Sequence, residues 1–237
     1  MKQVIQKIRK ELKSKVDLEY KKGFTKYFNG EVNSYGVRTP YVRKISKKYY
    51  VDVKHLHKEE IFVLCEELLK SDISENATIA FEWAFNLKKY YTQNDFYIFE
   101  KWLGFYVNNW AKCDDFLTHS FGVFLLKFPE YLPHIKKNWT SSENRWLKRA
   151  SAVILIPAIK KDVKFLQDVF EVTDALLLDK DDLVQKGYGW LLKETANQYE
   201  KEVFDYVMKH KNYMPRTSLR YAIEKMPKSL KQQAMAK

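Results

Sequence analysis

Apolar residues recur along most of the chain at the three- and four-residue spacing that places them on one face of an α-helix. Ile5, Ile8 and Leu12 follow this period near the N-terminus. The pattern predicts helices over residues 1–16, 18–28, 40–50, 58–70, 75–91, 95–107, 110–127, 129–138, 143–161, 163–178, 182–197, 200–210 and 218–226. The chain has seven glycines, six prolines and no Asn-Gly or Asp-Gly hairpin signal, so an all-α fold is predicted.

Short connections between helices of similar length predict consecutive antiparallel pairs, each burying its apolar side on its neighbours. We therefore expect an α-solenoid that spans residues 1–237 as a single domain, with a compact orthogonal bundle as the alternative because no strict period repeats. Residues 150–159 are apolar nearly all round, which predicts a helix inside the stack with a kink at Pro157.

Capping residues indicate where several helices begin. Asn109, Ser142 and Asp162 stand directly before amphipathic segments and are predicted N-caps. Asp179 and Asp181 offer caps for the helix that begins at residue 182.

The formal net charge of +12 and the sequence pI near 9.4 favour a polyanionic partner, with nucleic acid as the first candidate and an anionic membrane surface as the second. No apolar run approaches the roughly 18 to 20 residues of a membrane span, and no secretory signal is present, so a soluble protein is expected. The only cysteines, Cys65 and Cys113, are too few for a disulfide scaffold or a thiolate zinc site, which fits a cytoplasmic protein.

The segment from Asn108 to Glu130 holds the first candidate for chemistry. A helix capped by Asn109 places Trp110 and Asp114 four residues apart on one face, with the carboxylate close to the positive end of the helix dipole. An anion beside an indole could stabilise a positively charged sugar or base. The alternative is a core tryptophan and an ordinary solvated aspartate.

Two groups of cations supply a surface for a polyanion. Arg145, Lys148 and Arg149 fall along one side of the helix predicted to start near residue 143, although a solvated basic face is the alternative. Lys186, Trp190 and Lys193 form one stripe, at i, i+4 and i+7. Lysines on both sides of an indole favour an exposed tryptophan in a basic groove over a core one.

Other kinds of site are poorly supported. His55 and His57 lack further clustered donors for a catalytic metal, and no Gly-rich phosphate loop or Gly-x-Ser-x-Gly motif is present. Cys113, within a helix and with no assignable histidine beside it, is better explained as a small buried residue than as a nucleophile. We expect neither a metal nor another cofactor.

Five segments, residues 35–45, 109–116, 144–150, 185–194 and 216–225, together resemble the AlkD-like DNA alkylation repair family in order and spacing. The resemblance implies a single curved, right-handed stack of HEAT-like helix pairs that holds duplex DNA on a basic concave surface. It also implies a cofactor-free, monofunctional glycosylase, expected to be a monomer, that removes cationic purines of the 3-methyladenine and 7-methylguanine class.

The resemblance also assigns roles to single residues. The catalytic aspartate falls on Asp114, and the two active-site tryptophans fall on Trp110 and Trp190. The phosphate-contacting arginine falls on Arg149, a DNA-contacting tyrosine on Tyr27 and a basic position on Lys193, and these join Arg145, Lys148 and Lys186 as the expected DNA-binding residues. The motif departs from the family where Ala111 follows Trp110 and Asp115 doubles Asp114. A non-catalytic solenoid that binds DNA or a protein is therefore the alternative.

The implied chemistry agrees with these residue types. An alkylated purine already carries positive charge, so its departure needs an anion facing the oxocarbenium-like sugar and a positioned water. Asp114 can serve both needs, and indole faces attract cations with roughly 0.5 to 2 kcal/mol each.

Overall fold

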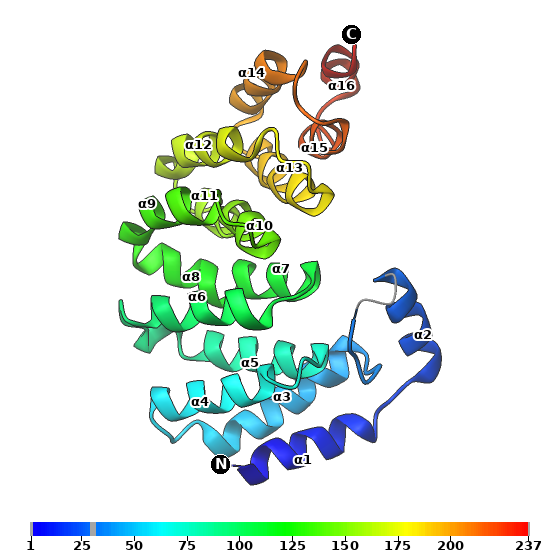
Figure 1. The fold of residues 1–237 in the computed structure, drawn as a ribbon, viewed down its shortest axis with the longest axis vertical. Coiled ribbons are helices and arrows are strands. Elements are labelled where there is room, and N and C mark those ends of the chain that lie inside the picture. Colours follow the sequence, from blue (N-terminus) through cyan, green and yellow to red (C-terminus); the bar gives the residue numbers. More distant parts are fainter. Residues whose placement is uncertain (1, 29–31, 237) are drawn as a thin grey trace. The chain divides into compact units, whose positions relative to one another are not determined.

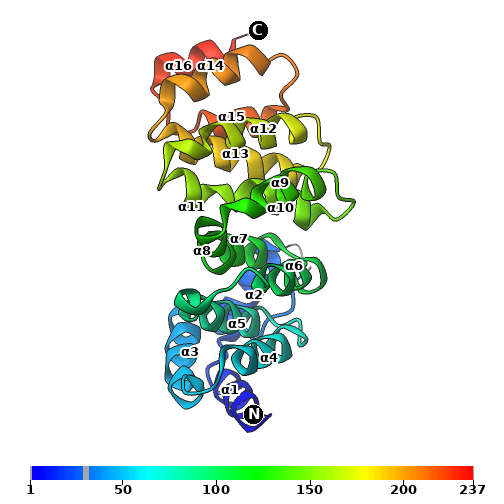
Figure 2. The same ribbon diagram turned by 90° about the vertical axis from the view of Figure 1, so that its left-hand side faces the viewer.

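The protein is described by a computed structural model that covers residues 2–28 and 32–236, and every regular element in this part of the chain is helical. The predicted all-α class is confirmed. The chain divides into two compact units, Met1–Ser120 and Phe121–Lys237, whose helices are drawn in Figures 1 and 2.

The first unit stacks its helices in two layers. Its elements are α1 Lys2–Lys13, α2 Leu18–Tyr27, α3 Thr39–Val53, α4 Lys58–Leu69, α5 Ser74–Asn86, the 3₁₀ turn η1 Lys88–Tyr90, α6 Asp95–Tyr106 and α7 Trp110–Thr118. Helices α1, α3, α5 and α7 pack on one another in that order, whereas α4 packs on α1, α5 and α6. Within this unit, alternate helices therefore form the successive layers expected of helical repeats.

Aromatic side chains fill the space between these layers. Trp83, Trp102 and Phe99 are fully buried, and the rings of Phe81 and Phe116 stack at a centroid distance of 4.5 Å. Ile79 and Ala84 of α5 are also fully buried in this core. Helix α2 differs from the other helices of the unit because none of its own residues is buried.

The second unit contains more short elements. They are α8 Ser120–Lys127, which starts at the last residue of the first unit, then η2 Pro129–Tyr131, α9 Leu132–His134, the π-helical turn η3 Ile135–Trp139, α10 Arg145–Val153, α11 Leu155–Ile159, η4 Val163–Phe165, α12 Leu166–Leu176, α13 Asp182–Ala196, α14 Glu200–His210, α15 Arg216–Ala222 and α16 Lys228–Met235. Helix α13 packs on α10, α12, α14 and α15, so it is the centre of this unit.

The single helix predicted over residues 110–127 is wrong, because the backbone breaks between α7 and α8. His119 has φ −117° and ψ −94°, outside the helical region. Directly after it, the buried Ser120 hydroxyl donates to the Phe81 carbonyl over 2.6 Å. This hydrogen bond fixes the start of α8 against α5. It joins residues 39 positions apart, so the spacing of apolar residues within one helix cannot predict it.

The cap predicted at Ser142 is also wrong. Helix α10 begins at Arg145 and Asn144 is its N-cap, since the Asn144 side chain accepts from the Trp146 N–H over 2.8 Å. Ser142 acts one step earlier, accepting from the Asn144 N–H over 3.1 Å. The caps predicted at Asn109 and Asp181 are confirmed by side-chain bonds to the amides that follow them.

Pro157 interrupts the apolar segment as predicted, but the break lies one turn earlier. A proline has no N–H, so the carbonyl of Val153 lacks its usual helical donor. Helix α10 ends at Val153 and α11 begins at Leu155. Apart from Pro157 itself, every residue from Ala150 to Ile159 is buried.

The last helix, α16, was absent from the predicted elements. Its sequence, KSLKQQAM, has no extended apolar stripe and buries only Ala234. It packs on α14. The preceding helix α15 runs from Arg216 to Ala222 instead of over residues 218–226.

Candidate functional site

Helix α7 presents the predicted indole and carboxylate near its start. The Asn109 side chain accepts from the Lys112 N–H over 3.0 Å, which fixes the first turn and makes Trp110 the first helical residue. Trp110 and Asp114 are both partly exposed, so neither the core indole nor the fully solvated aspartate describes them. One helical turn separates the two side chains.

The end of α2 supports Trp110. The Phe28 ring stacks on the indole with a centroid distance of 5.0 Å and an interplanar angle of 10°, and the Tyr27 ring meets the indole edge-on at 5.6 Å. Tyr27 is 71% exposed, whereas Phe28 is buried. The structure thus brings the predicted Tyr27 and Trp110 together. Since Phe28 covers one face of the indole, a cation would have to use the other face.

A buried ammonium group holds the start of α7. The Lys112 side chain is only 4% exposed, and its Nζ donates to the Asp72 carboxylate over 2.5 Å and to Asn108 Oδ1 over 2.9 Å. Asp72 also accepts from the side-chain amides of Asn33 and Asn108. Burial by itself would raise the pKa of Asp72, but these hydrogen bonds, led by that of Lys112, lower it below its ordinary value.

A buried carboxylate organises the segment before α3. Glu75 is 5% exposed and accepts from the backbone N–H groups of residues 35–37 and from the hydroxyl of Ser34. These bonds tie residues 34–37 to the start of α5, which packs against α7.

Sequence reasoning missed both anchors, Lys112 and Glu75. Lys112 lies in the same turns as the buried residues Cys113, Phe116 and Leu117, so its position on an apolar side was a readable signal of a buried, paired lysine. Glu75 carried no comparable signal, because the amides that it binds are distant in sequence.

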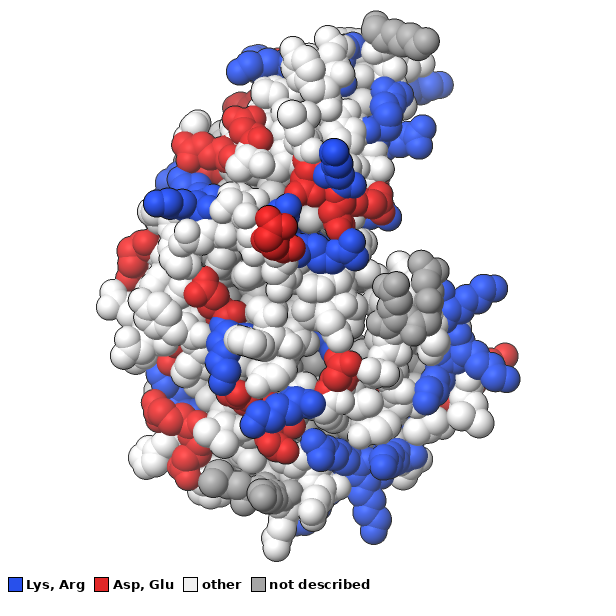
Figure 3. Space-filling model, viewed as in Figure 1, with Lys and Arg blue, Asp and Glu red and all other residues white. Residues whose placement is uncertain are grey.

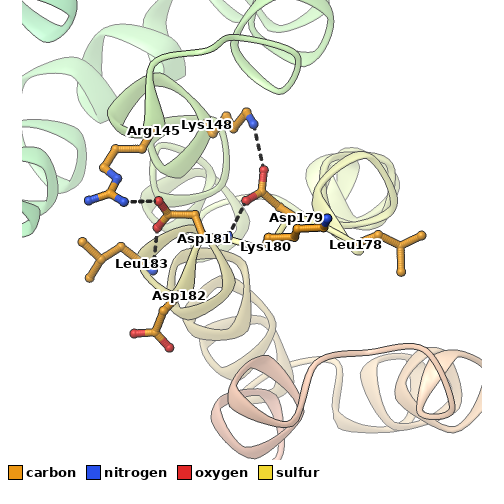
Figure 4. A pocket seen from close by; sticks show the side chains of 8 residues that line it. All are labelled: Arg145, Lys148, Leu178, Asp179, Lys180, Asp181, Asp182 and Leu183. Atoms are coloured by element: carbon orange, nitrogen blue, oxygen red, sulfur yellow. Dashed lines mark hydrogen bonds and ion pairs between the residues drawn. The ribbon is translucent and has the colours of Figure 1, made fainter.

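In the second unit, the basic side chains of α10 face an acidic segment that begins α13. Arg145 pairs with Asp181 over 2.5 Å, and Lys148 pairs with Asp179 over 2.9 Å. Figure 4 shows both cations directed at these carboxylates across an open hollow lined by Arg145, Lys148 and residues 178–183. The hydrogen bond that Lys148 donates to the Asp179 carboxylate raises the pKa of the ammonium. The solvated basic face that was the alternative is thus a set of ion pairs.

Arg149 lies apart from its two neighbours in the row. It is 5% exposed, and its Nη1 donates to the Leu183 carbonyl over 2.6 Å. A Cβ added to Gly187 would come within 3.1 Å of the Arg149 side chain, so the glycine leaves room for it. Arg149 therefore joins α10 to α13, and its contact with a phosphate stays a prediction.

The stripe along α13 is partly exposed. Trp190 is neither buried nor fully exposed, and its Nε1 donates to Glu194 over 3.3 Å. Lys186 pairs with Asp182 over 2.6 Å, and Lys193 pairs with Glu224 over 3.1 Å while lying over the Tyr221 ring. The core alternative for Trp190 does not hold, but each flanking lysine already has a carboxylate.

Among residues 2–28 and 32–236, no group of three or more His, Cys, Asp or Glu side chains could hold a metal ion. In the same described part of the chain, no helix is both long and apolar enough to cross a membrane.

The layered packing of helices places this chain in the class of helical-repeat proteins. Its candidate site is an indole and a carboxylate on one capped helix. The family model for DNA alkylation repair enzymes matches residues 8–226, and the chain belongs to this family. The family implies a DNA substrate. No curated protein matches the chain.

Two solved structures resemble the fold. A predicted DNA alkylation repair enzyme from Enterococcus faecalis matches with a TM-score of 0.79 and 16% identity, over 90% of this chain and 98% of that chain. The smu.31 protein from Streptococcus mutans UA159 matches with a TM-score of 0.52 and 20% identity, over 82% of this chain and 94% of that chain. At these identities the likeness shows the fold alone.

Proposed function

We propose that this family member is a monofunctional DNA glycosylase that hydrolyses the N-glycosidic bond of cationic alkylated purines, of the 3-methyladenine and 7-methylguanine class, in duplex DNA. The observation that carries the proposal is the pairing of Trp110 with Asp114 on one side of a helix whose start is held by Asn109 and Lys112. A helix used only for packing has no need of a partly exposed acid one turn from a partly exposed indole.

The reaction needs little from the protein except a placed anion. Breaking the bond from C1′ to the purine nitrogen sends the bonding pair to the purine, which leaves as a neutral base, and positive charge develops on the sugar. Asp114 stabilises that charge and orients a water whose oxygen bonds to C1′, and its carboxylate can accept the released proton. The lesion's own charge replaces protonation by a general acid.

The indoles bind positive charge in this scheme. The free face of Trp110 contacts the cationic base or sugar, and Trp190 supplies a second aromatic surface. Tyr27, at the edge of Trp110, contacts the DNA backbone.

In this scheme the cations of the second unit bind DNA phosphates in place of their present carboxylate partners. Four of these cations each contact a carboxylate: Arg145, Lys148, Lys186 and Lys193. A phosphate must therefore replace an aspartate or glutamate at each of them, so the net gain in binding per contact is smaller than for an unpaired lysine.

Base release from methylated duplex DNA, measured by chromatography of the freed purines, tests the proposal. We expect Asp114→Asn to lower the rate by about 100-fold or more, as the loss of one electrostatic stabiliser does in other enzymes. DNA affinity should stay the same or rise slightly, because a negative charge is removed.

Asp115→Asn is the matched control, since it removes the neighbouring acid, which pairs with His119, and should keep most of the activity. Equal release by the wild type and Asp114→Asn would remove Asp114 from the mechanism. DNA binding without any base release by the wild type would instead support the non-catalytic solenoid.

A further inference from the structure

The positive charge of the chain is concentrated at its N-terminus. Residues 1–54 contain fifteen Lys and Arg against five Asp and Glu, whereas residues 55–237 contain twenty-seven against twenty-five. Most of the net charge of +12 therefore belongs to the segment that forms α1, α2 and α3. The helices that carry Trp110 and Trp190 lie in the nearly balanced remainder.

Among the described residues, ten lysines of residues 1–54 are exposed and have no carboxylate within ion-pair distance, and six of them lie between Lys10 and Lys26. Three lie at the end of α1 and in the turn after it and three lie on α2, and we call them the N-terminal basic surface: Lys10, Lys13, Lys15, Lys21, Lys22 and Lys26. Elsewhere in the segment, Arg38, Arg43 and Lys48 have acidic partners. Four further exposed lysines have none among the described residues: Lys7, Lys44, Lys47 and Lys54. Solubility alone does not require that unpaired lysines be gathered on two adjacent helices.

Residues 35 and 36 link the lysines of α1 to those of α2. The Lys13 ammonium lies 6.0 Å from the centre of the Tyr35 ring, and the next residue, Gly36, packs against the Lys21 side chain and bonds to the Asp17 N–H. Residues 35–36 thus join the end of α1 to the start of α2. Figure 3 shows Lys and Arg side chains gathered over α2 and the adjoining part of α1.

Helix α2 separates this surface from Trp110. Tyr20 and Phe24 lie on its inner side, where Phe24 contacts Phe28, the ring that stacks on Trp110. Lys21, Lys22 and Lys26 line a shallow hollow on the other side together with Leu18 and Thr25. Because Trp110 and these lysines lie on opposite sides of α2, a DNA segment that contacts Trp110 would not contact the lysines.

We propose that the N-terminal basic surface binds the phosphate backbone of DNA outside the segment that holds the lesion. Closely spaced, unpaired lysines suit a polymer with regularly spaced charges, because each contact releases condensed counterions without breaking an ion pair. A membrane surface fits less well. Of the exposed large apolar residues, Val16, Leu18 and Tyr27 are next to these lysines in the sequence, and the Tyr27 ring packs against Trp110. Interfacial helices bury a broader apolar face than this.

The test measures binding of undamaged duplex DNA as a function of salt. The variant carries Lys21→Gln, Lys22→Gln and Lys26→Gln, all at exposed positions, so folding should be unaffected. The control carries Lys161→Gln, Lys209→Gln and Lys228→Gln, which make the same change in net charge at exposed positions of the second unit. Both proteins keep Asp114 and Trp110.

We expect the slope of log K against log salt to become shallower by about 2 to 3 in the variant and by less than about 1 in the control, since each phosphate contact contributes roughly 0.9. Equal slopes for the variant and the control would overturn the proposal. So would a variant that loses binding to vesicles of anionic phospholipid while its DNA slope stays unchanged, because that result assigns the surface to membranes.

The proposal depends on the proposed function only in taking DNA as the polyanion. Loss of base release in Asp114→Asn tests the chemistry, whereas the salt slope tests the surface on DNA without lesions. Either result can therefore fail while the other stands.

Discussion

Two groups of cations in this chain differ in whether they form ion pairs. One is the N-terminal basic surface, and the other comprises the cations on α10 and α13. The former have no acidic partner among the described residues, whereas Arg145, Lys148 and Lys186 pair with the aspartates of residues 179–182. A count of Lys and Arg treats the two groups alike. Of the two groups, only the second has ion pairs that a phosphate would have to replace.

The second unit also contains a cation whose role is set by burial. Arg149 is enclosed between α10 and α13, where its guanidinium satisfies the Leu183 carbonyl. Its charge contributes to the cohesion of the unit. The difference from an exposed lysine is that removing Arg149 leaves a cavity and breaks a hydrogen bond between two helices.

The largest expected effect sharpens this contrast. Arg149→Ala should lower the free energy of unfolding by about 2 to 4 kcal/mol, because it removes the hydrogen bond to the Leu183 carbonyl and leaves a cavity beside Gly187. Lys22→Ala, at an exposed position, should change it by less than about 0.5 kcal/mol. Urea denaturation of both variants measures the difference.

The opposite result has a clear meaning. If Arg149→Ala keeps the stability of the wild type and the salt slope of DNA binding falls by about 1, the arginine leaves its buried position to hold a phosphate, as the family resemblance implies.

A smaller effect is expected when the acidic partners are removed. Asp179→Asn combined with Asp181→Asn should strengthen DNA binding by roughly 3- to 10-fold and steepen the salt slope by up to about 2, because Lys148 and Arg145 no longer have to leave a carboxylate. Asparagine is chosen because Asp181 caps α13 and an amide oxygen can replace the carboxylate as acceptor. Titration of undamaged duplex DNA at several salt concentrations gives both quantities. An unchanged affinity would show that these pairs do not compete with phosphate.

The smallest expected effect concerns the pair of His119 and Asp115 at the end of α7, because histidine changes its charge near neutral pH. The hydrogen bond that His119 donates to the Asp115 carboxylate raises the pKa of the imidazole above its ordinary value of 6.5. A raised pKa in the folded state means that the pair stabilises the fold at pH below about 6.5 and that this contribution is lost as the pH rises through the folded value. His119 is about half exposed, so solvent screening keeps the contribution below about 1 kcal/mol.

His119→Gln should remove this pH dependence while leaving the stability at pH 8 nearly unchanged. Thermal melts at pH 5.5 and pH 8 measure it in both proteins. The same decline in stability between these pH values in the wild type and His119→Gln would assign it to other groups.

The amino-acid sequence by itself determined the features that depend on neighbours along the chain. The helical period identified most helices, and the caps at Asn109 and Asp181 were readable because a cap bonds to amides two or three residues further on. The shared side of Trp110 and Asp114 likewise follows from helix geometry. Motifs spread over most of the chain were enough to indicate the family that the comparison confirmed.

Only the tertiary structure decided which of the chosen side chains are buried, stacked or paired. The stacking of Phe28 on Trp110 and the burial of Lys112 against Asp72 join residues from separate elements. The carboxylates opposite Arg145 and Lys148 lie more than thirty residues further along the chain. A one-dimensional pattern records the charge of a side chain, but its availability depends on long-range partners, and only the packing of helices brings those partners within bonding distance.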